Sequence, residues 1–423
     1  MASILFLSQS LPYPPDSGGT QRTYHVLNEL QKGFDVFLVA FSRRGHQADS
    51  KQRRDAQEEL ARRLTHVSPA VPYPAEWSLL RRAWDHGRSL LSGQVYSRFQ
   101  YRVPEFGLRL DEVLASVRPA LVHLDSIDLY MWLERLHGIP ATCTHHDIES
   151  HLLRRRAKAA SHPLLARYIQ HQAELMRNVE AEACPRFDLN LTMSPVDSER
   201  LARIAPGARI WEVPNAVDLD RFSLVPVEQR ESEAVVFIGP TYLFANRDAI
   251  DFLLRDIWPR VRERRPTAQL TLVGRNAPGQ KEMFARIPGV TPLGRVETIQ
   301  PYVGRAACSV IPIRVGGGTR IKILESWALG TPIVTTSIGG EGLEIKDGEN
   351  ALVRDNPAEF ADAIVSVLED QSLRSRLGQG GRSTVEALYN WKKVGNRLRL
   401  RYEEIITRHQ SDGRVHSGTQ TND

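Results

Sequence analysis

The sequence predicts a protein of the α/β class with two doubly wound, Rossmann-like domains. Short runs of consecutive apolar residues alternate with helical patterns, as expected for parallel strands buried on both faces. The alternation occurs twice, with an interruption at VPNAVDLDRF (213–222), where Pro and Asn break regular structure and no periodicity continues. A chain of 423 residues is also longer than a domain with a single hydrophobic core usually is, so two domains are expected on size alone.

The first predicted domain covers residues 1–213. Its expected strands are the apolar runs at 3–8, 36–42, 120–126, 141–146 and 188–194. Its expected helices run from about Thr20 to Lys32, through most of an Arg-rich region that ends near Leu114, and from about Pro163 to Ala183.

The second predicted domain covers residues 214–389. Its expected strands are the runs at 234–239, 268–274, 289–294, 308–313 and 332–336. Its expected helices are 246–264 and most of 357–409, of which we expect the part 390–409 to pack back on the first domain. The polar segment 410–423 predicts a disordered tail.

Composition argues against several classes of protein. The chain has 55 basic and 50 acidic residues, whereas a nucleic-acid-binding protein usually concentrates its positive charge more strongly, so no nucleic-acid partner is expected. Its three cysteines form no CxxC pair, which indicates a reducing compartment. No signal peptide or membrane span is recognisable, so we expect a cytoplasmic protein. The basic runs at 43–109 and 154–158 are typical of solvated helix faces, with docking on anionic lipid at the inner membrane face as the alternative.

The stretch VGGGTRIKILESWALGTP (315–332) is the strongest candidate for a binding site. It follows a predicted buried strand, and ligands of doubly wound sheets bind beyond the carboxyl ends of the strands. Glycines allow the backbone to approach a ligand closely. We expect Thr319 to cap the following helix, so that the N–H groups of the first turn face an anion such as a phosphate.

Two charged residues on that helix extend the prediction. Lys322 and Glu325 are three positions apart and therefore share a face, with the carboxylate about 5 Å further along the helix. The amides and a cation suit a diphosphate, and the carboxylate suits ribose hydroxyls. An exposed ion pair beside a flexible turn is the alternative. The GxGxxG, GxxxxGK[ST] and HExxH motifs are absent, which weakens dehydrogenase, NTPase and metalloprotease interpretations.

The stretch GGGTRIKILESWALGTPIVTT, followed by IGGEGLEIKDGENALV, resembles the donor-binding core of retaining glycosyltransferases of family four. VPNAVDLDRF, PGVTPLGRV and PPDSGG extend the resemblance over most of the chain. It implies the GT-B fold, in which two Rossmann-like domains face a cleft. One departure concerns the two glutamates that relatives often carry: Glu325 matches the second, but Gly317 stands at the place of the first, which touches the donor sugar.

The resemblance assigns the remaining residues of the second domain. It implies that the donor diphosphate is held by Gly317, Gly318, Thr319, Arg320 and Lys322, with Arg247 as a further candidate. Ribose and base would be held by Glu325 and by the loop of Gly294, Arg295 and Val296, where an ordinary turn is the alternative.

The first domain supplies a smaller set of candidates. Gly18 and Gly19 stand before a predicted helix and would border the diphosphate. His146 matches the histidine that contacts the donor sugar in relatives, which makes His146, Lys322 and Glu325 the catalytic candidates. Asp147 is expected to contact the acceptor or to cap the helix that follows it.

These observations predict a retaining, metal-independent transferase that moves a sugar from a nucleotide sugar to an acceptor hydroxyl. No cofactor or metal site is expected, and the co-substrate would be a UDP- or GDP-sugar. The acceptor would be a carbohydrate, a lipid-linked sugar or a small molecule. A nucleotide-sugar epimerase of the same fold and a non-catalytic sugar-nucleotide-binding protein are the alternatives, and the sequence does not determine the oligomeric state.

Overall fold

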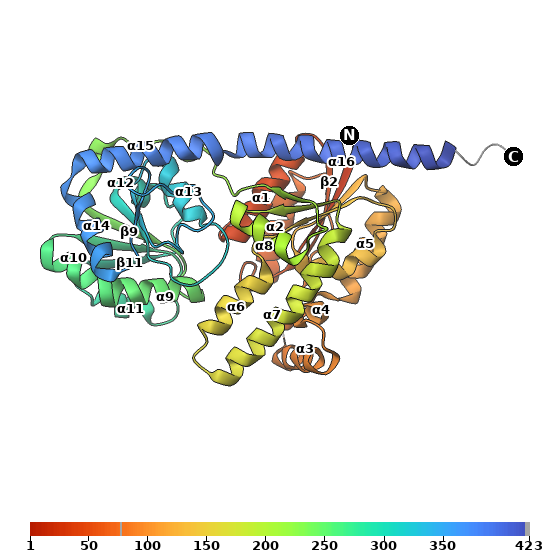
Figure 1. Cartoon of the computed structure of the whole chain (residues 1–423), viewed down its shortest axis with the longest axis horizontal. Coiled ribbons are helices and arrows are strands. Elements are labelled where there is room, and N and C mark those ends of the chain that lie inside the picture. The colour runs from red at the N-terminus through yellow and green to blue at the C-terminus, as the bar shows by residue number, and fades with distance from the viewer. Residues whose placement is uncertain (77, 419–423) are drawn as a thin grey trace. The chain divides into compact units, whose positions relative to one another are not determined.

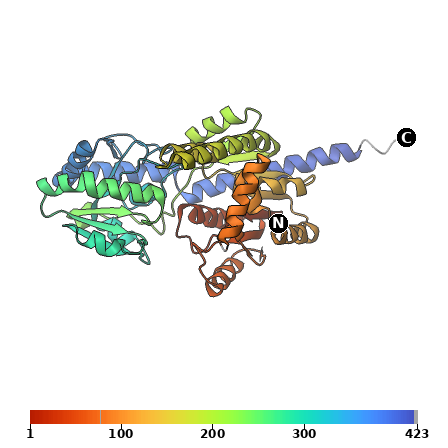
Figure 2. The same ribbon diagram turned by 90° about the horizontal axis from the view of Figure 1, so that it is seen from below.

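A computed structural model describes residues 1–76 and 78–418, with side chains up to Ser411 (Figures 1 and 2). The chain forms two compact units, of which unit 1 contains residues 1–214 and 392–423 and unit 2 contains residues 215–391. Each unit has its own parallel sheet, and this confirms the predicted α/β class with two Rossmann-like domains.

The sheet of unit 1 has the strand order β3-β2-β1-β5-β6-β7-β8, with β4 also paired to β2. The strands are β1 (Ser3–Ser8), β2 (Asp35–Ser42), β3 (His66–Val67), β4 (Val71–Pro72), β5 (Leu121–Leu124), β6 (Ala141–Thr144), β7 (Leu189–Thr192) and β8 (Ile210–Glu212). In the central strand β1, Leu5 pairs with Phe37 on one side and with Val122 on the other. The strand order reverses between β1 and β5, and a doubly wound sheet binds its ligands at such a point.

Helices cover both faces of this sheet. They are α1 (Gly18–Leu30), α2 (Ser50–Ala61), α3 (Leu79–Ser92), α4 (Tyr96–Tyr101), α5 (Pro104–Val117), α6 (Glu149–Lys158), α7 (Pro163–Ala183), α8 (Pro195–Ile204) and the long α16 (Trp391–Gly418). The apolar strand faces and helix stripes form a continuous core that includes Leu5, Phe41, Phe106 and Cys143.

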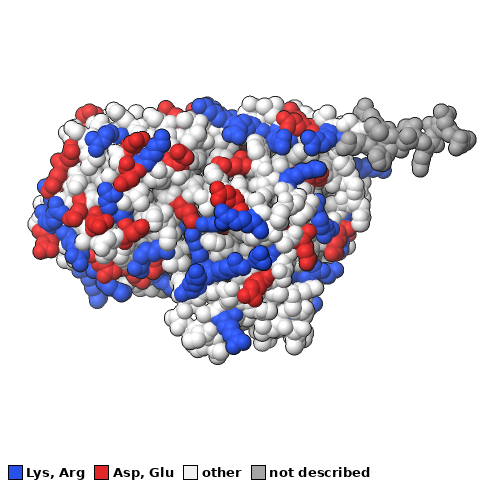
Figure 3. Space-filling model, in the orientation of Figure 1, with Lys and Arg blue, Asp and Glu red and all other residues white. Residues whose placement is uncertain are grey.

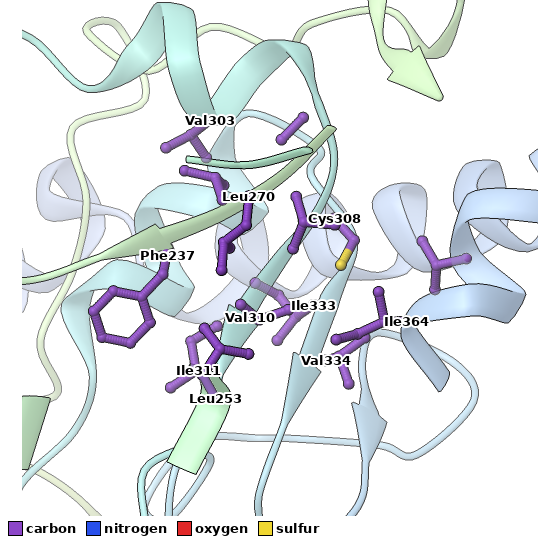
Figure 4. Close-up of a cluster of buried hydrophobic side chains, with 14 of the residues drawn as sticks. Phe237, Leu253, Leu270, Val303, Cys308, Val310, Ile311, Ile333, Val334 and Ile364 are labelled. Atoms are coloured by element: carbon purple, nitrogen blue, oxygen red, sulfur yellow. The ribbon is translucent and has the colours of Figure 1, made fainter. Parts of the chain in front are cut away.

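Unit 2 has the strand order β11-β10-β9-β12-β13-β14, and all its pairs are parallel. Its strands are β9 (Glu231–Ile238), β10 (Gln269–Val273), β11 (Val290–Gly294), β12 (Ala306–Ile311), β13 (Ile333–Thr335) and β14 (Leu352–Val353). The order reverses between β9 and β12. Figure 4 shows how Phe237, Leu270, Val310 and Val334 from neighbouring strands pack in its core.

The helices of unit 2 include a continuous segment with an irregular centre. They are α9 (Phe244–Phe252), α10 (Trp258–Arg264), α11 (Gln280–Ala285), α12 (Gln300–Arg305), α13 (Ile321–Ala328), α14 (Pro357–Glu369) and α15 (Gln371–Leu388). A π-helical turn, Leu253–Ile257, joins α9 to α10 where a single helix was predicted. Pro259 has no N–H to donate, so the regular hydrogen bonding of one α-helix cannot pass through it.

Two predictions about helix ends are wrong. Helix α1 begins at Gly18, so Gly18 and Gly19 form its first turn and do not precede it; Ser17 provides the N-cap. Helix α16 continues to Gly418, so residues 410–418 of the predicted disordered tail are helical, and 419–423 lie outside the described residues. Adding residues to the end of an existing helix costs little free energy, because the unfavourable nucleation step has already taken place. The prediction of disorder relied on the polar composition of the segment and did not consider the helix before it.

The C-terminal helix α16 belongs to unit 1 from Lys392 onward. Tyr402 is fully buried, and its hydroxyl oxygen lies 2.8 Å from Nδ1 of the buried His123 on β5 and accepts a hydrogen bond from Thr142 at 3.3 Å. Arg399 donates a hydrogen bond at 2.7 Å to the buried carboxylate of Glu29 on α1. The last helix is therefore part of the N-terminal core.

We predict that Tyr402→Ala lowers the free energy of unfolding by about 3–5 kcal/mol, because it leaves a cavity and removes one of the hydrogen-bond partners of His123. Urea unfolding of the full chain measures this loss. Leu400→Ala, at a half-exposed position of the same helix, should change stability by less than about 0.5 kcal/mol. Equal effects of the two substitutions would contradict the assignment of α16 to the core.

Candidate functional site

Three neighbouring strands of unit 2 end in glycine at the carboxyl edge of the sheet. Strands β9 and β10 are followed directly by Gly239 and Gly274, and β11 ends at Gly294. The φ angles of these glycines are 153°, 143° and 83°. A Cβ on Gly274 would lie 2.3 Å from the carbonyl oxygen of Gly239. A Cβ on Gly239 would lie 2.7 Å from Nδ2 of Asn246. At Gly239 and Gly274 the absence of a Cβ therefore allows the strand ends to pack closely against each other and against Asn246. Of the three glycines, only Gly294 was predicted from the sequence.

The loop after β12 curls around the side chain of Arg320. Gly316 and Gly318 have φ angles of 139° and 67°, which favour glycine. The guanidinium of Arg320 donates to the carbonyl oxygens of Gly317 and Gly318, the latter at 2.6 Å. Arg320 thus stabilises the conformation of the loop in which the sequence analysis placed the diphosphate.

Thr319 does not cap helix α13, contrary to the prediction. The N-cap residue is Arg320, and no side chain in the described part of the chain makes a capping hydrogen bond there. The hydroxyl of Thr319 instead accepts a hydrogen bond from Nδ2 of Asn215 at 2.6 Å. Within the first turn, the N–H of Ile323 donates to the carbonyl oxygen of Arg320 at 2.9 Å. The positive end of the helix dipole lies at this start and favours an anion.

Lys322 carries a cationic group in the first turn of α13. Its ammonium donates to Oδ1 of Asn246 at 3.0 Å and lies 4.8 Å from the centre of the Phe237 ring. Burial lowers the pKa of Lys322 from 10.5 to about 7; the charge of Arg320 lowers it further and Glu325 opposes the shift. An anion beside it would favour the charged form. Asn246 was missed, because only its contact with Lys322, 76 positions away, reveals its role.

The other predicted residues of unit 2 lie in different environments. Glu325 lies one turn into α13 with 7% of its surface exposed. Arg247 is exposed on α9, and its guanidinium carbon lies 5.9 Å from the Phe244 ring. Arg295 is exposed beyond β11, whereas Val296 packs against the hydrophobic core. Glu325 therefore lies on the helix that carries Lys322, and Arg247 follows Asn246 on α9.

In unit 1, a buried carboxylate occupies the switch point of the sheet. Asp125 directly follows β5, and its Oδ2 accepts hydrogen bonds from Thr23 on α1 at 2.6 Å and from Ser8 at the end of β1 at 3.2 Å. Oδ1 of Asp125 lies 3.3 Å from Nε2 of His146. Burial alone would raise the pKa of Asp125, but His146 and the hydrogen bond from Thr23 lower it below its ordinary value.

Of the two adjacent histidines, His146 is the one accessible at the edge of the sheet. His145 is buried and bonded to Oδ1 of Asn190 at 3.0 Å, and burial lowers its pKa to about 4. Successive side chains at a strand end point to opposite faces, which separates the pair. The side chain of His146 is 21% exposed and is oriented by Asp125, a partner that the sequence analysis missed.

The other predicted site residues of unit 1 lie at the starts of α6 and α1. Asp147 is half-buried and does not cap α6, whose N-cap residue is Ile148 without a side-chain bond among the described residues. At the start of α1, Ser17 and Thr20 form a capping box, with Thr20 N–H to Ser17 Oγ at 3.4 Å. A Cβ on Gly19 would meet no atom within 4 Å, so the space beside it is open.

Two family matches cover most of the chain. Residues 17–221 match the family described as glycosyltransferase family 4, and residues 232–370 match glycosyl transferases group 1. Over 216 residues, 48% of this chain and 56% of the other, the sequence is 28% identical to the phosphatidyl-myo-inositol mannosyltransferase of Mycobacterium leprae. The chain thus spans little more than half of that enzyme. An uncharacterized 44.6 kDa protein in the cps region of Klebsiella pneumoniae is 21% identical over 412 residues, 93% of this chain and 98% of the other.

Solved structures with the same fold cover nearly the whole chain. Sucrose-phosphate synthase from Thermosynechococcus elongatus superposes with a TM-score of 0.71 at 18% identity, over 96% of this chain and 100% of that one. HepE of Anabaena, solved with UDP, gives a TM-score of 0.66 at 14% identity, over 95% and 100%. These likenesses confirm the GT-B fold.

We predict that Lys322→Met stabilises the ligand-free protein at pH 7. The pKa of Lys322 is lower in the folded state, so between about pH 7 and 10.5 the unfolded chain binds the additional proton and stability rises with pH. The gain at pH 7 should be about 1 kcal/mol, since the side chain is only partly buried and keeps part of its hydration, and it should disappear near pH 10.5. Urea unfolding at several pH values tests this.

Lys281→Met, at an exposed position of α11, is the matched control. Its effect should be small and should not vary over the same pH range. A destabilised Lys322→Met variant at pH 7 would show that the ammonium is not disfavoured in the folded protein.

Proposed function

Because the chain belongs to family 4 of the glycosyltransferases, we propose that it transfers a sugar from a nucleoside-diphosphate sugar to an acceptor hydroxyl with retention of anomeric configuration. The observation that carries this proposal is the uncapped start of α13 beside Lys322, at the switch point of the unit 2 sheet. Peptide N–H groups, a helix dipole and a cation together favour a diphosphate.

We assign the residues of unit 2 to the donor. Lys322 and the amides of Gly317, Gly318 and Thr319 bind the diphosphate, while Arg320 holds the loop through its bonds to two carbonyl groups. Asn246 orients Lys322, and Arg247 approaches the outer phosphate. Glu325 accepts from ribose hydroxyls, and the loop of Gly294, Arg295 and Val296 receives the base. The GGGTR-x-K-x-x-E stretch is thus the donor motif of this chain.

The chemical step depends on stabilising the leaving group. As the glycosidic bond to the diphosphate breaks, negative charge grows on the departing phosphate oxygen. Preorganised amides and a cation stabilise this charge without reorganising, and such terms are among the largest in catalysis. The acceptor oxygen bonds to the anomeric carbon on the face from which the diphosphate leaves, and the departing phosphate oxygen takes the proton of the acceptor hydroxyl. Because bond formation and bond cleavage occur on the same face, the configuration is retained. These residues supply the charge stabilisation that a metal ion supplies elsewhere, so activity should resist EDTA.

We assign to unit 1 the groups that meet the sugar and the acceptor. His146, fixed by the ionised Asp125, contacts the transferred sugar. Gly18 and Gly19 leave room beside the first turn of α1, and Asp147 contacts the acceptor. Neither Asp125 nor His146 needs to act as a base in this route, and the contact between them instead keeps the imidazole in one orientation.

Relatives with a described ligand or activity indicate the substrate classes. HepE was solved with UDP and with UDP-glucose, and a Corynebacterium glutamicum relative is described as GDP-mannose-dependent. We therefore propose a UDP- or GDP-sugar as donor. The cps-region relative and the phosphatidyl-myo-inositol mannosyltransferases favour a polysaccharide or lipid-linked acceptor. Across the described residues, no helix is long and apolar enough to cross a bilayer.

Binding and product analysis together test the proposal. A thermal-shift screen of UDP, GDP and ADP should show stabilisation by one diphosphate, because a ligand that binds only the folded state raises its stability. The matching nucleotide sugar should then be transferred with an unchanged anomeric configuration, with and without EDTA. Release of an epimerised donor would support an epimerase, and binding without turnover would support a non-catalytic protein.

We predict that Lys322→Ala and Glu325→Gln each reduce turnover by about tenfold or more, equivalent to about 1.4 kcal/mol in activation free energy. The lysine variant loses charge stabilisation in the transition state, and the glutamine variant keeps the shape of a buried side chain while losing its charge. Steady-state kinetics, with circular dichroism to verify folding, measure the effect. Lys281→Ala is the control and should keep parental turnover; two active site variants with normal turnover would exclude the assigned site.

A further inference from the structure

Helix α3 exposes a continuous apolar surface. Leu79, Leu80, Trp84, Leu90 and Leu91 are between 57% and 92% exposed. At 3.6 residues per turn, these five side chains fall within an arc of about 140° on one side of the helix. Solvated helices of globular proteins normally direct such an arc toward the core. Here it faces away from the rest of unit 1.

The opposite side of α3 is polar and hydrogen-bonded to its neighbours. Asp85 and Ser89 are fully buried; Arg81 donates to both oxygens of Asp85 at 3.0 Å, and Ser89 Oγ accepts from Gln172 on α7 at 2.8 Å. His86 Nδ1 lies 2.5 Å from the hydroxyl of Tyr168, also on α7. These specific bonds fix the orientation of α3, so the outward position of the leucines is a property of the fold.

Basic side chains border the apolar arc. On the helical projection Arg88 follows Trp84 on one border and Arg82 lies beyond Leu79 on the other, and both are exposed. Figure 3 shows few acidic side chains on the surface over α3. The only acid of α3, Asp85, is buried and paired with Arg81. The surface is therefore apolar at its centre and positive at its rim.

The end of the α6–α7 hairpin extends this surface. Leu164 and Leu165, at the start of α7, are 73% and 51% exposed and lie one turn from Tyr168, which contacts α3. Arg156 and Lys158 are exposed and lie in the last turn of α6, on the other side of the connection between the two helices. The contact between His86 and Tyr168 brings the first part of α7 against α3.

We propose that the apolar surface of α3, together with Leu164 and Leu165, inserts into the interface of a bilayer that contains anionic lipid. Leucine and tryptophan side chains would enter the acyl boundary while Arg82, Arg88, Arg156 and Lys158 contact negatively charged headgroups. A symmetric contact between two copies is less favourable, because it would bring the same arginine rim against itself. This proposal does not require the assigned glycosyltransferase activity.

Sedimentation of the full-length protein with lipid vesicles tests the proposal without donor or acceptor. The protein should bind vesicles of phosphatidylcholine with phosphatidylglycerol about tenfold or more tightly than vesicles of phosphatidylcholine alone, and high salt should weaken the binding. The double variant Leu80→Glu with Leu91→Glu should lose binding by about tenfold or more, because both charges would enter the apolar boundary. Both positions are exposed, so the fold should be retained.

Two further variants make the result specific. Leu400→Glu, at a half-exposed leucine between two arginines on α16, should bind vesicles like the parent. Trp84→Leu should also bind, but it should lose the tryptophan quenching that brominated lipids cause in the parent. Failure of the parent to bind anionic vesicles, or unchanged binding by the double glutamate variant, would overturn the proposal. A third outcome would also overturn the proposal: light scattering shows that the parent is a dimer and the double variant a monomer, and the parent does not bind vesicles.

Discussion

The half-buried ammonium of Lys322 is the group on which the rest of the unit 2 site depends. Its partners are an amide oxygen and an aromatic ring, which replace only part of the hydration that the ammonium loses on burial. Burial therefore favours the neutral form of the amine. A helix start without a side-chain cap adds positive potential beside it. Both features cost some stability in the absence of a ligand, and the compact anion that we propose as ligand would compensate both.

Unit 1 shows the opposite charge at the equivalent place in its own sheet. Both sheets reverse their strand order at one point, and a charged side chain lies there in each: Lys322 after β12 and Asp125 after β5. Asp125 stays ionised because hydroxyl groups and an imidazole surround it. The two doubly wound sheets therefore present different chemistry from one architecture, which accords with donor binding in one unit and acceptor chemistry in the other.

Local patterns carried the prediction of the fold and part of the site. The long buried strands are runs of apolar residues, whereas β3, β4, β8 and β14, with two or three residues each, leave no such pattern. The glycine loop and Lys322 are adjacent in sequence and could be recognised. Thr23 and Asp125 are 102 positions apart, and Asn215 and Thr319 are 104 apart. Only folding brings such pairs together, which is why Asp125 was missed and Thr319 was misassigned as a cap.

The bond between Tyr402 and His123 has a practical consequence for exchanging parts between homologues. The N-terminal half is completed by residues that follow the whole of unit 2 in the chain. A chimera cut once near residue 214 would join a foreign last helix to the native β5. Unit 2 should therefore be exchanged as an insert of 215–391, with two junctions and with the native α16 retained from Lys392.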